Sequence, residues 1–312
     1  MLPLALRRLL LTVPTVFAAA TLVFLLVHLV PGDPVEVMLG ESARAADKEA
    51  LRQALGLDRP LVEQYQAFLV GLARGDLGRS LVTGEPVMTM LATRIPATAE
   101  LTAAALAVGI LLALPLGLLA AARPGTWIDR AAVAFALLGV SMPSFWLGPL
   151  LIILFAIELR WLPVSGRGTW EHLVLPAMTL GLGMAAILTR MTRASLLECM
   201  GEDYVRTARA KGVGRGRIVG RHALVNALSP VVTILGLQFG ALLAGTVITE
   251  TIFAWPGVGR LTIDAINQRD YPVVQACVLA IAAAFVAANV LADLANAWLD
   301  PRIRGATAGS TR

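Results

Sequence analysis

The sequence predicts an all-α membrane protein with six transmembrane helices and both termini in the cytoplasm. Three observations lead to this prediction: 57% of the 312 residues are hydrophobic, only 15% are charged, and the apolar residues gather into long blocks. Soluble domains carry about 25% charged residues, which excludes an ordinary soluble protein. Each block is long enough for a helix to cross about 30 Å of hydrocarbon at about 1.5 Å per residue.

The first block begins just after Arg7 and Arg8, where a secretory signal would also place basic residues. Its apolar stretch runs for about 22 residues, beyond the roughly 7–15 of a signal core, so we interpret it as a retained helix. The six predicted spans are 9–30, 98–122, 131–157, 173–189, 231–253 and 273–299.

The basic residues between the spans predict the orientation. With the amino terminus inside, the cytoplasmic stretches hold fifteen Lys and Arg residues, whereas the short external loops hold four. Cytoplasmic loops carry the excess of basic residues in membrane proteins. The same placement accounts for the net charge of +5 without a nucleic-acid partner.

Five of the six tryptophans fall at predicted span ends, where indole rings favour the headgroup region. The inner ends hold Trp127 and Trp298, the outer ends hold Trp161, Trp170 and Trp255, and Trp146 alone lies deep in a span.

The external stretch 31–97 is too long for a simple connector. Its pattern predicts two short helices, Ala43–Leu55 and Leu61–Ala73, stopped by Gly56 and Gly75. The stretch is either a cap over the bundle or a docking surface for a molecule outside the membrane. We therefore divide the chain into 1–97, a five-helix core at 98–304 and a cytoplasmic tail at 305–312.

The cytoplasmic loop 190–230 contains a predicted short helix over Tyr204–Lys211, with Asp203 as its cap and Gly212 and Gly214 at its end. The simplest interpretation is an ordinary basic loop. The alternative is a docking helix, because small residues flanked by exposed arginines suit a polar groove on another protein.

The residues needed for several chemistries are missing. The two lysines, Lys48 and Lys211, exclude a Gly-Lys-Ser/Thr phosphate loop. The three histidines and two cysteines show no metal-ligand spacing. We therefore expect no catalytic, cofactor-binding or metal-binding residues, and not an enzyme.

A kink is predicted at Pro143, within the sequence that continues to Phe145 and Trp146. It is either a packing kink or a bend that lines a pore. Glycines of the fifth span, Gly240 among them, allow close helix approach or line a pathway. Glu100 and Asp293 are ionisable residues within the predicted spans, and neither lies at the midplane, where ion-coupled carriers place them.

Seven motifs, taken in order over residues 4–304, give the chain a clear resemblance. It resembles the inner-membrane permease subunits of ABC importers for dipeptides, oligopeptides, glutathione and nickel. The motifs are Val30-Pro-Gly-Asp-Pro34, Leu55-Gly-Leu-Asp-Arg-Pro-Leu61, Gly75-Asp-Leu-Gly-Arg-Ser80, Arg206-Thr-Ala-Arg-Ala-Lys-Gly212, Phe253-Ala-Trp-Pro-Gly-Val-Gly-Arg260, Arg269-Asp-Tyr-Pro272 and Asp300-Pro-Arg-Ile-Arg304.

The resemblance implies a type I importer fold that forms half of a translocation pathway. Its implied partners are a paralogous permease subunit, two cytoplasmic ATPase subunits that bind the ATP and Mg, an extracytoplasmic solute-binding protein and membrane lipid. The binding protein would deliver cargo at the outer face, near Trp255 and Pro256. The candidate pathway or gate residues are Pro143, Phe145, Trp146, Gly240, Trp255 and Pro256.

The resemblance also makes the short helix a coupling helix that sits in a groove of an ATPase. Family members generally carry Glu-Ala-Ala there, whereas this chain has Arg206, Thr207 and Ala208, which leaves the contacting side chains open. The candidate coupling residues are Asp203, Tyr204, Arg206, Thr207, Ala208, Arg209, Lys211 and Gly212.

The resemblance narrows the cargo without fixing it. Dipeptides or oligopeptides are the expected cargo, with nickel and glutathione as alternatives. An ion-coupled secondary transporter is the alternative of another class, and it would need no ATPase.

Overall fold

The computed structural model describes residues 14–25, 34–40, 43–54 and 56–299. Within these ranges four helical spans are long and apolar enough to cross a membrane: α5 (Val87–Ala122), α8 (Glu171–Gly201), the joined η2 and α11 (Ile218–Ile252), and α13 (Tyr271–Leu299) over Tyr271–Ala292. A fifth is added if the bent pair Trp127–Ser141 and Ser144–Glu158 is counted as one span. The apolar helix Pro14–Leu25 is shorter, and the predicted first span reaches beyond it into residues outside the described ranges. Six spans and cytoplasmic termini therefore stay predictions.

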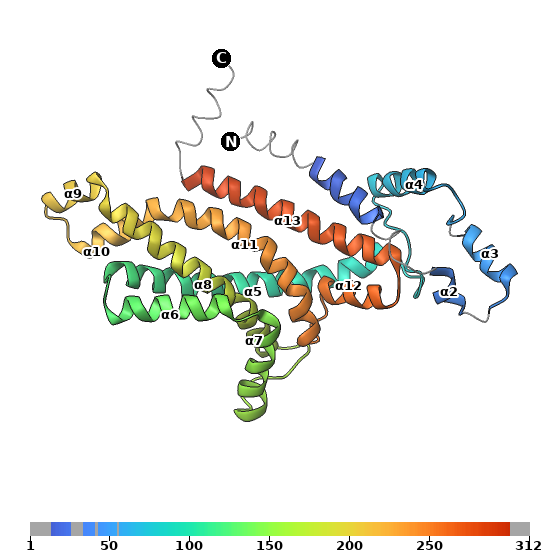
Figure 1. Ribbon diagram of the computed structural model, residues 1–312, viewed down its shortest axis with the longest axis horizontal. Helices are drawn as coiled ribbons and strands as arrows, with labels where there is room; N and C mark the ends of the chain where they lie inside the picture. Colours follow the sequence, from blue (N-terminus) through green and yellow to red (C-terminus); the bar gives the residue numbers. More distant parts are fainter. Residues whose placement is uncertain (1–13, 26–33, 41–42, 55, 300–312) are drawn as a thin grey trace, which may run out of the picture. The chain divides into compact units, whose positions relative to one another are not determined.

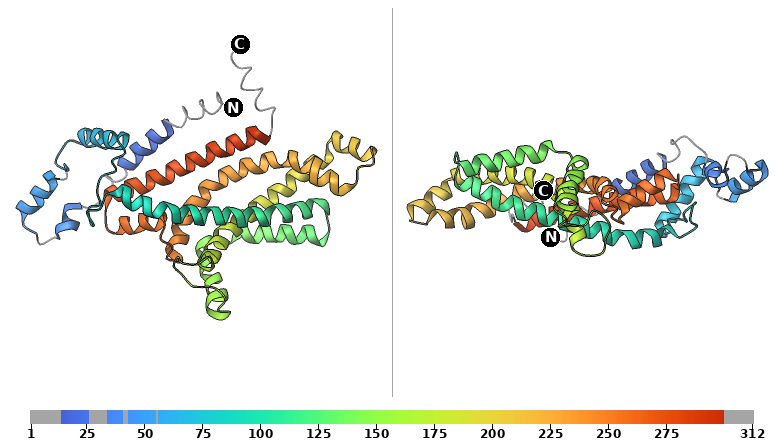
Figure 2. Two further views of the ribbon diagram at one scale, coloured as in Figure 1. Left: turned by 180° about the vertical axis from the view of Figure 1, so that it is seen from behind. Right: turned by 90° about the horizontal axis from the view of Figure 1, so that it is seen from below.

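The chain divides into two compact units, each described by itself. The first contains residues 99–255 and 285–299. In it α8 is the central helix and packs against α6 (Trp127–Ser141) and α11 (Leu224–Ile252), and α6 also runs alongside α5 in all views (Figures 1 and 2). Small residues allow these helices to approach closely, since a Cβ at Gly117 would lie 2.6 Å from Cβ of Thr192.

The helix of the predicted third span is broken at Pro143. Helix α6 ends at Ser141, α7 (Ser144–Leu151) begins after the proline, and α7 continues as the π-helix η1 (Ile152–Glu158). The two parts meet at 105°. Proline lacks an amide hydrogen and forces the preceding residue out of the helical region, as the extended backbone of Met142 shows. The predicted break is confirmed.

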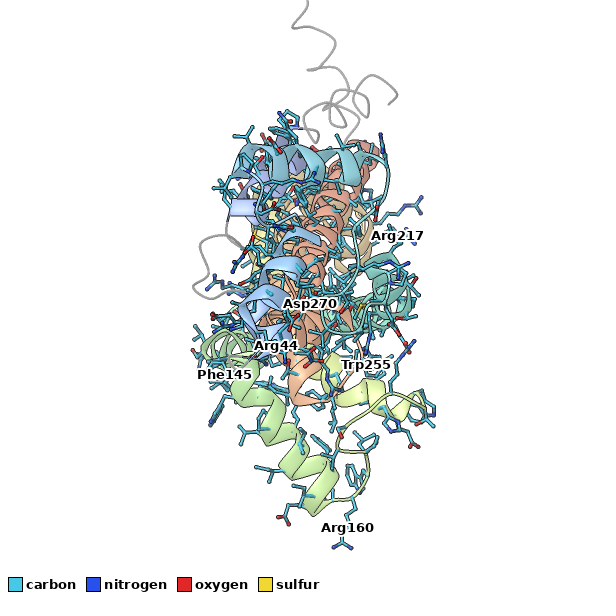
Figure 3. The ribbon with its side chains drawn as sticks, turned by 90° about the vertical axis from the view of Figure 1, so that its right-hand side faces the viewer. Arg44, Phe145, Arg160, Arg217, Trp255 and Asp270 are labelled. Atoms are coloured by element: carbon cyan, nitrogen blue, oxygen red, sulfur yellow. The ribbon has the colours of Figure 1, made fainter. Side chains whose placement is uncertain are left out.

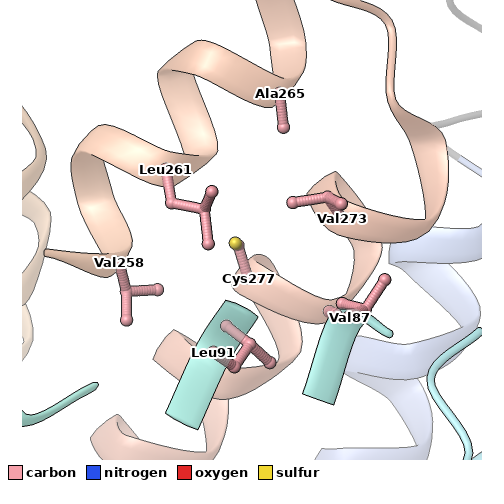
Figure 4. Close-up of a cluster of buried hydrophobic side chains, with 8 residues drawn as sticks. Val87, Leu91, Val258, Leu261, Ala265, Val273 and Cys277 are labelled. Carbon is pink, nitrogen blue, oxygen red and sulfur yellow. The ribbon is translucent and has the colours of Figure 1, made fainter. Parts of the chain in front are cut away.

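The second unit contains the described residues of 14–98 and residues 256–284. Its helices are Pro14–Leu25, α2 (Pro34–Leu39), α3 (Ala45–Ala54), α4 (Leu61–Ala73), the start of α5, α12 (Val258–Asn267) and the start of α13. Its apolar core joins α5, α12 and α13 (Figure 4). The core residues are Val87, Leu91, Val258, Leu261, Ala265, Val273, Ala276 and Cys277.

A buried carboxylate organises the loop that precedes α5 in this unit. Asp270 accepts hydrogen bonds from the hydroxyl of Ser80 and, at 3.1 Å, from the amide of Leu81. The Ser80 hydroxyl oxygen in turn accepts the amides of Val82 and Thr83 at 3.2 and 2.9 Å. The Gly-Asp-Leu-Gly-Arg-Ser and Arg-Asp-Tyr-Pro motifs are thus physically joined, although 189 residues separate Leu81 from Asp270.

The predicted helix boundaries need several corrections. Helix α5 begins at Val87 instead of 98, and α8 continues to Gly201, so the predicted loop 190–230 is largely helical. Helix α12 was not predicted. The two short helices predicted within 31–97 are confirmed as α3 and α4, and Gly56 and Gly75 after them have φ of +67° and +74°. Their external position stays a prediction.

Candidate coupling site and pathway residues

The predicted coupling helix is α9 (Asp203–Ala210), a short helix of the first unit that follows α8. Its end is fixed by hydrogen bonds from the amide of Gly212 to the carbonyl of Arg209 and from the amide of Val213 to the carbonyl of Ala208, at 2.9 and 3.1 Å. This is the Schellman arrangement, which needs the left-handed conformation that Gly212 adopts at φ +74°. The predicted stop at Gly212 is confirmed.

The start of α9 differs from the prediction. Glu202 occupies the N-cap position without a side-chain hydrogen bond, and Asp203 is the first helical residue. The Asp203 carboxylate instead lies 3.3 Å from Nη1 of Arg206. Both side chains are strongly exposed, so this pair adds little to stability.

Helix α9 has one buried contact and one free face. Val205 is fully buried, whereas Arg206, Thr207 and Arg209 are exposed and Ala208 is half-buried. Partial desolvation raises the pKa of the Tyr204 phenol, although 39% of this residue is exposed. The exposed face therefore presents two cations with little bulk between them.

Helix α9 contacts α8 and η2, and an apolar cluster joins these two elements to α5 and α11. Buried residues Ala121 of α5, Leu196 of α8 and Ala223 of η2 (Ile218–Ala223) form it with Ala227 of α11. Between α9 and η2 the chain forms the short helix α10 (Arg215–Arg217).

A second connection lies near this end of α8. Arg193 binds both carboxylate oxygens of Asp129 through Nε and Nη2, and the Nη2 distance is 2.9 Å. The Asp129 carboxylate also accepts the amide of Gly125 at 2.9 Å. Asp129 is buried and Arg193 largely so. Helix α8 is thereby tied to the turn between α5 and α6.

The predicted pathway residues fall in different environments. Phe145 and Trp146 follow the break at Pro143 and are more than half exposed, and Figure 3 shows Phe145 at the edge of the ribbon. Gly240 lies against the ring of Phe285, and a Cβ at Gly240 would lie 2.8 Å from Cδ2 of that ring. This contact agrees with the packing alternative, and a pathway role for these residues stays a prediction.

Trp255 is not at a lipid headgroup as the sequence suggested, because its side chain is fully buried in the first unit. Its indole lies under the guanidinium of Arg167, whose Cζ is 5.6 Å from the ring centroid. Arg167 also binds Glu100, with Nη2 at 2.6 Å from Oε2. Pro256 is half-buried in the second unit. The rings of Trp127, Trp161 and Trp170 are exposed as expected.

Sequence reasoning missed both of these charged pairs. Glu100 was noted only as an ionisable residue within a span, Arg193 entered only the count of basic residues in 190–230, and Asp129 was not singled out. Both pairs join residues more than sixty positions apart. The sequence offered one clue to these pairs, namely that the two residues of each pair have opposite charges and lie at the same predicted side of the membrane. Many other pairs of residues meet the same condition.

The chain matches two family descriptions that together cover nearly all of it. Residues 113–305 match the binding-protein-dependent transport system inner membrane component. Residues 1–102 match the amino-terminal part of a membrane component of the same kind of system.

Similar proteins include the glutathione transport system permease protein GsiC of Pectobacterium atrosepticum, which is 46% identical over 304 residues, or 97% of this chain and 99% of that protein. GsiC of Escherichia coli strain K12 is 43% identical with the same coverage. A solved chain of the MetNI methionine ABC transporter, in an inward-facing conformation, matches with a TM-score of 0.59 at 21% identity, over 69% of this chain and 99% of that one.

Proposed function

The chain belongs to the family of binding-protein-dependent transport system inner membrane components, and from that membership we propose that it forms one half of a pathway for glutathione or a peptide of similar size. As a member it is a multi-pass permease subunit of an ABC importer in the inner membrane, and a transporter component, not an enzyme. ATP hydrolysis belongs to ATPase partners, which sets aside the ion-coupled carrier.

The cargo proposal rests on one observation. Two glutathione permeases are 43% and 46% identical to this chain over nearly their full lengths. Glutathione is a tripeptide, so it belongs to the peptide class that the sequence motifs suggested. Nickel is the weaker candidate, because no feature of the described residues favours a metal over a peptide.

The coupling proposal rests on α9. Its buried Val205 anchors the helix, and its exposed face presents Arg206 and Arg209 around the small Ala208. We propose that this face docks into a groove of a cytoplasmic ATPase, with one ATPase on this subunit and one on a second, paralogous permease. An extracytoplasmic solute-binding protein supplies cargo at the opposite side.

Reconstituted transport tests the cargo. The full complex, with its binding protein, is placed in liposomes containing ATP, and uptake of labelled glutathione, dialanine and Ni²⁺ is measured. We expect ATP-dependent uptake of glutathione and none of Ni²⁺. Uptake of Ni²⁺ alone would replace the peptide proposal, and uptake driven by a proton gradient without ATP would contradict the coupling proposal.

A further inference from the structure

Arg167 in the first unit is held in place from two sides. Its Nε and Nη2 lie 2.9 and 2.6 Å from the same oxygen of Glu100, and its guanidinium stacks on the buried indole of Trp255. The neighbouring backbone is fastened as well, because the amide of Gly166 donates to the carbonyl of Phe253 at 2.8 Å. A side chain that is usually flexible is thus preorganised.

The pair between Arg167 and Glu100 is also open to solvent. The two side chains are 38% and 41% exposed. An ion pair at this exposure contributes little to folding stability, in contrast with the buried partner of Arg193. The contribution of this ion pair to folding stability therefore does not explain why Arg167 is held in place. A ligand can separate Arg167 from Glu100 at little cost in folding free energy.

Resting on the function proposed above, we propose that Arg167 and Glu100 form a binding site for a zwitterionic peptide-type cargo. The fork of a guanidinium matches a carboxylate, and the Glu100 carboxylate occupies that position now. A cargo carboxylate replaces it with equal charge and equivalent hydrogen bonds. Glu100, once released, accepts the cargo's ammonium group, so the ion pair imitates the two ends of the ligand.

The site would also discriminate between a peptide cargo and a metal-ion cargo. A peptide or glutathione carries both a carboxylate and an ammonium group, and it satisfies both residues. A bare metal cation satisfies Glu100 but leaves Arg167 unpaired beside a positive charge. The predicted topology places the loop that carries Arg167 at the outer face, where a binding protein would release its cargo.

Arginine modification tests the site directly. The purified complex is treated with phenylglyoxal, and labelling of Arg167 is followed by mass spectrometry, without ATP and after trapping with ATP and vanadate. Arg160 is the internal control, because it lies in the same loop and points outward at the end of the ribbon (Figure 3). The probes are glutathione and its diethyl ester, which lacks free carboxylates.

We expect glutathione to slow labelling of Arg167 but not of Arg160, and the diester to have no effect. Glu100→Gln removes the carboxylate that would accept the ammonium group, so we expect the affinity for glutathione, read from the protection of Arg167, to fall about tenfold, which corresponds to about 1.4 kcal/mol of binding. Equal labelling of Arg167 with and without glutathione in both states of the unaltered complex would overturn the site. A failure of the reagent to reach Arg167 at all would do the same.

Transport by variants gives a second, independent measurement. With loaded binding protein at saturation, we expect Arg167→Ala and Arg167→Lys to lower glutathione uptake about tenfold, since lysine keeps the charge but loses the fork, and Arg160→Ala to leave it unchanged. Unchanged uptake by both Arg167 variants would remove the site while leaving the proposed function intact. Absence of ATP-driven uptake by the unaltered complex would remove the proposed function itself.

Discussion

Asp129 and Arg193 have opposite charges at contact distance, as Glu100 and Arg167 do, but greater burial gives them a different role. Asp129 is buried, and its carboxylate holds both Arg193 and the amide of Gly125. Removing one member of such a pair leaves the other charge desolvated and unpaired. An exposed pair, in contrast, returns both charges to water when it opens.

We therefore predict that Asp129→Asn destabilises the subunit by about 1–3 kcal/mol, the cost of an unsatisfied buried polar group. Thermal unfolding in detergent measures the change. Arg190→Gln is the matched control, because Arg190 lies on the same helix and is exposed. The exchange Asp129→Arg with Arg193→Asp should recover part of the loss. A melting temperature equal to that of the unaltered protein would show that the pair is dispensable.

Substitutions at Gly240 distinguish a role in helix packing from a role in the translocation pathway. We predict that Gly240→Ala costs about 1–3 kcal/mol by overpacking, because the new methyl meets the ring of Phe285. Gly183→Ala on α8 is the control, since nothing lies within 4 Å of a Cβ there. Adding Phe285→Leu to Gly240→Ala should restore both unfolding temperature and uptake. Restored stability with uptake still lost would assign Gly240 to the pathway.

Among the helices, hydropathy predicted the position of the apolar spans but not their full length. Helix α5 extends back to Val87 because Val87 and Leu91 pack into the core of the second unit, beyond the stretch that hydropathy detects. Helix α12 is short and half polar, so the same criterion missed it, although Val258, Leu261 and Ala265 lie on one face. Local breaks were predicted well at Pro143 and Gly212, because proline and glycine act through the backbone itself.

The candidate site was predictable only where it is local. The helix proposed for coupling, α9, follows from a run of about ten residues, so the local sequence is enough to predict it. The position of Trp255 under Arg167 depends on how distant segments pack, and an aromatic residue at a span end suits both lipid and protein interior. Pairing of Asp129 with Arg193 depends on packing in the same way.

Helix α9 is the element whose exposed face we propose for docking, and side chains of that face can be altered while the buried contact of Val205 is kept. We predict that Ala208→Glu abolishes ATP-driven uptake while the subunit still folds and inserts, because the new carboxylate adds bulk and a negative charge between Arg206 and Arg209. Ala46→Glu is the control, since Ala46 is exposed on α3 in the second unit. Normal uptake by Ala208→Glu would exclude this face from coupling.

The whole molecule is proposed to work as one part of an assembly with two separable interfaces. Large apolar side chains along its spans are exposed in the isolated chain, among them Leu111, Leu138 and Leu237, and such surface is covered by lipid or another subunit in a membrane. The proposed ATPase contact is instead the small, charged face of α9. A single substitution on α9 should therefore disrupt the ATPase contact and leave the contact with the second permease intact.

Purification of the tagged chain from native membranes in mild detergent tests this division. We predict that the unaltered chain brings down a second permease and two ATPases, identified by mass spectrometry. Ala208→Glu should retain the second permease and lose the ATPase docked on this chain, whereas Ala46→Glu should retain all partners. Loss of both kinds of partner from Ala208→Glu would mean that assembly is cooperative, and recovery of the unaltered chain alone would contradict the proposed assembly.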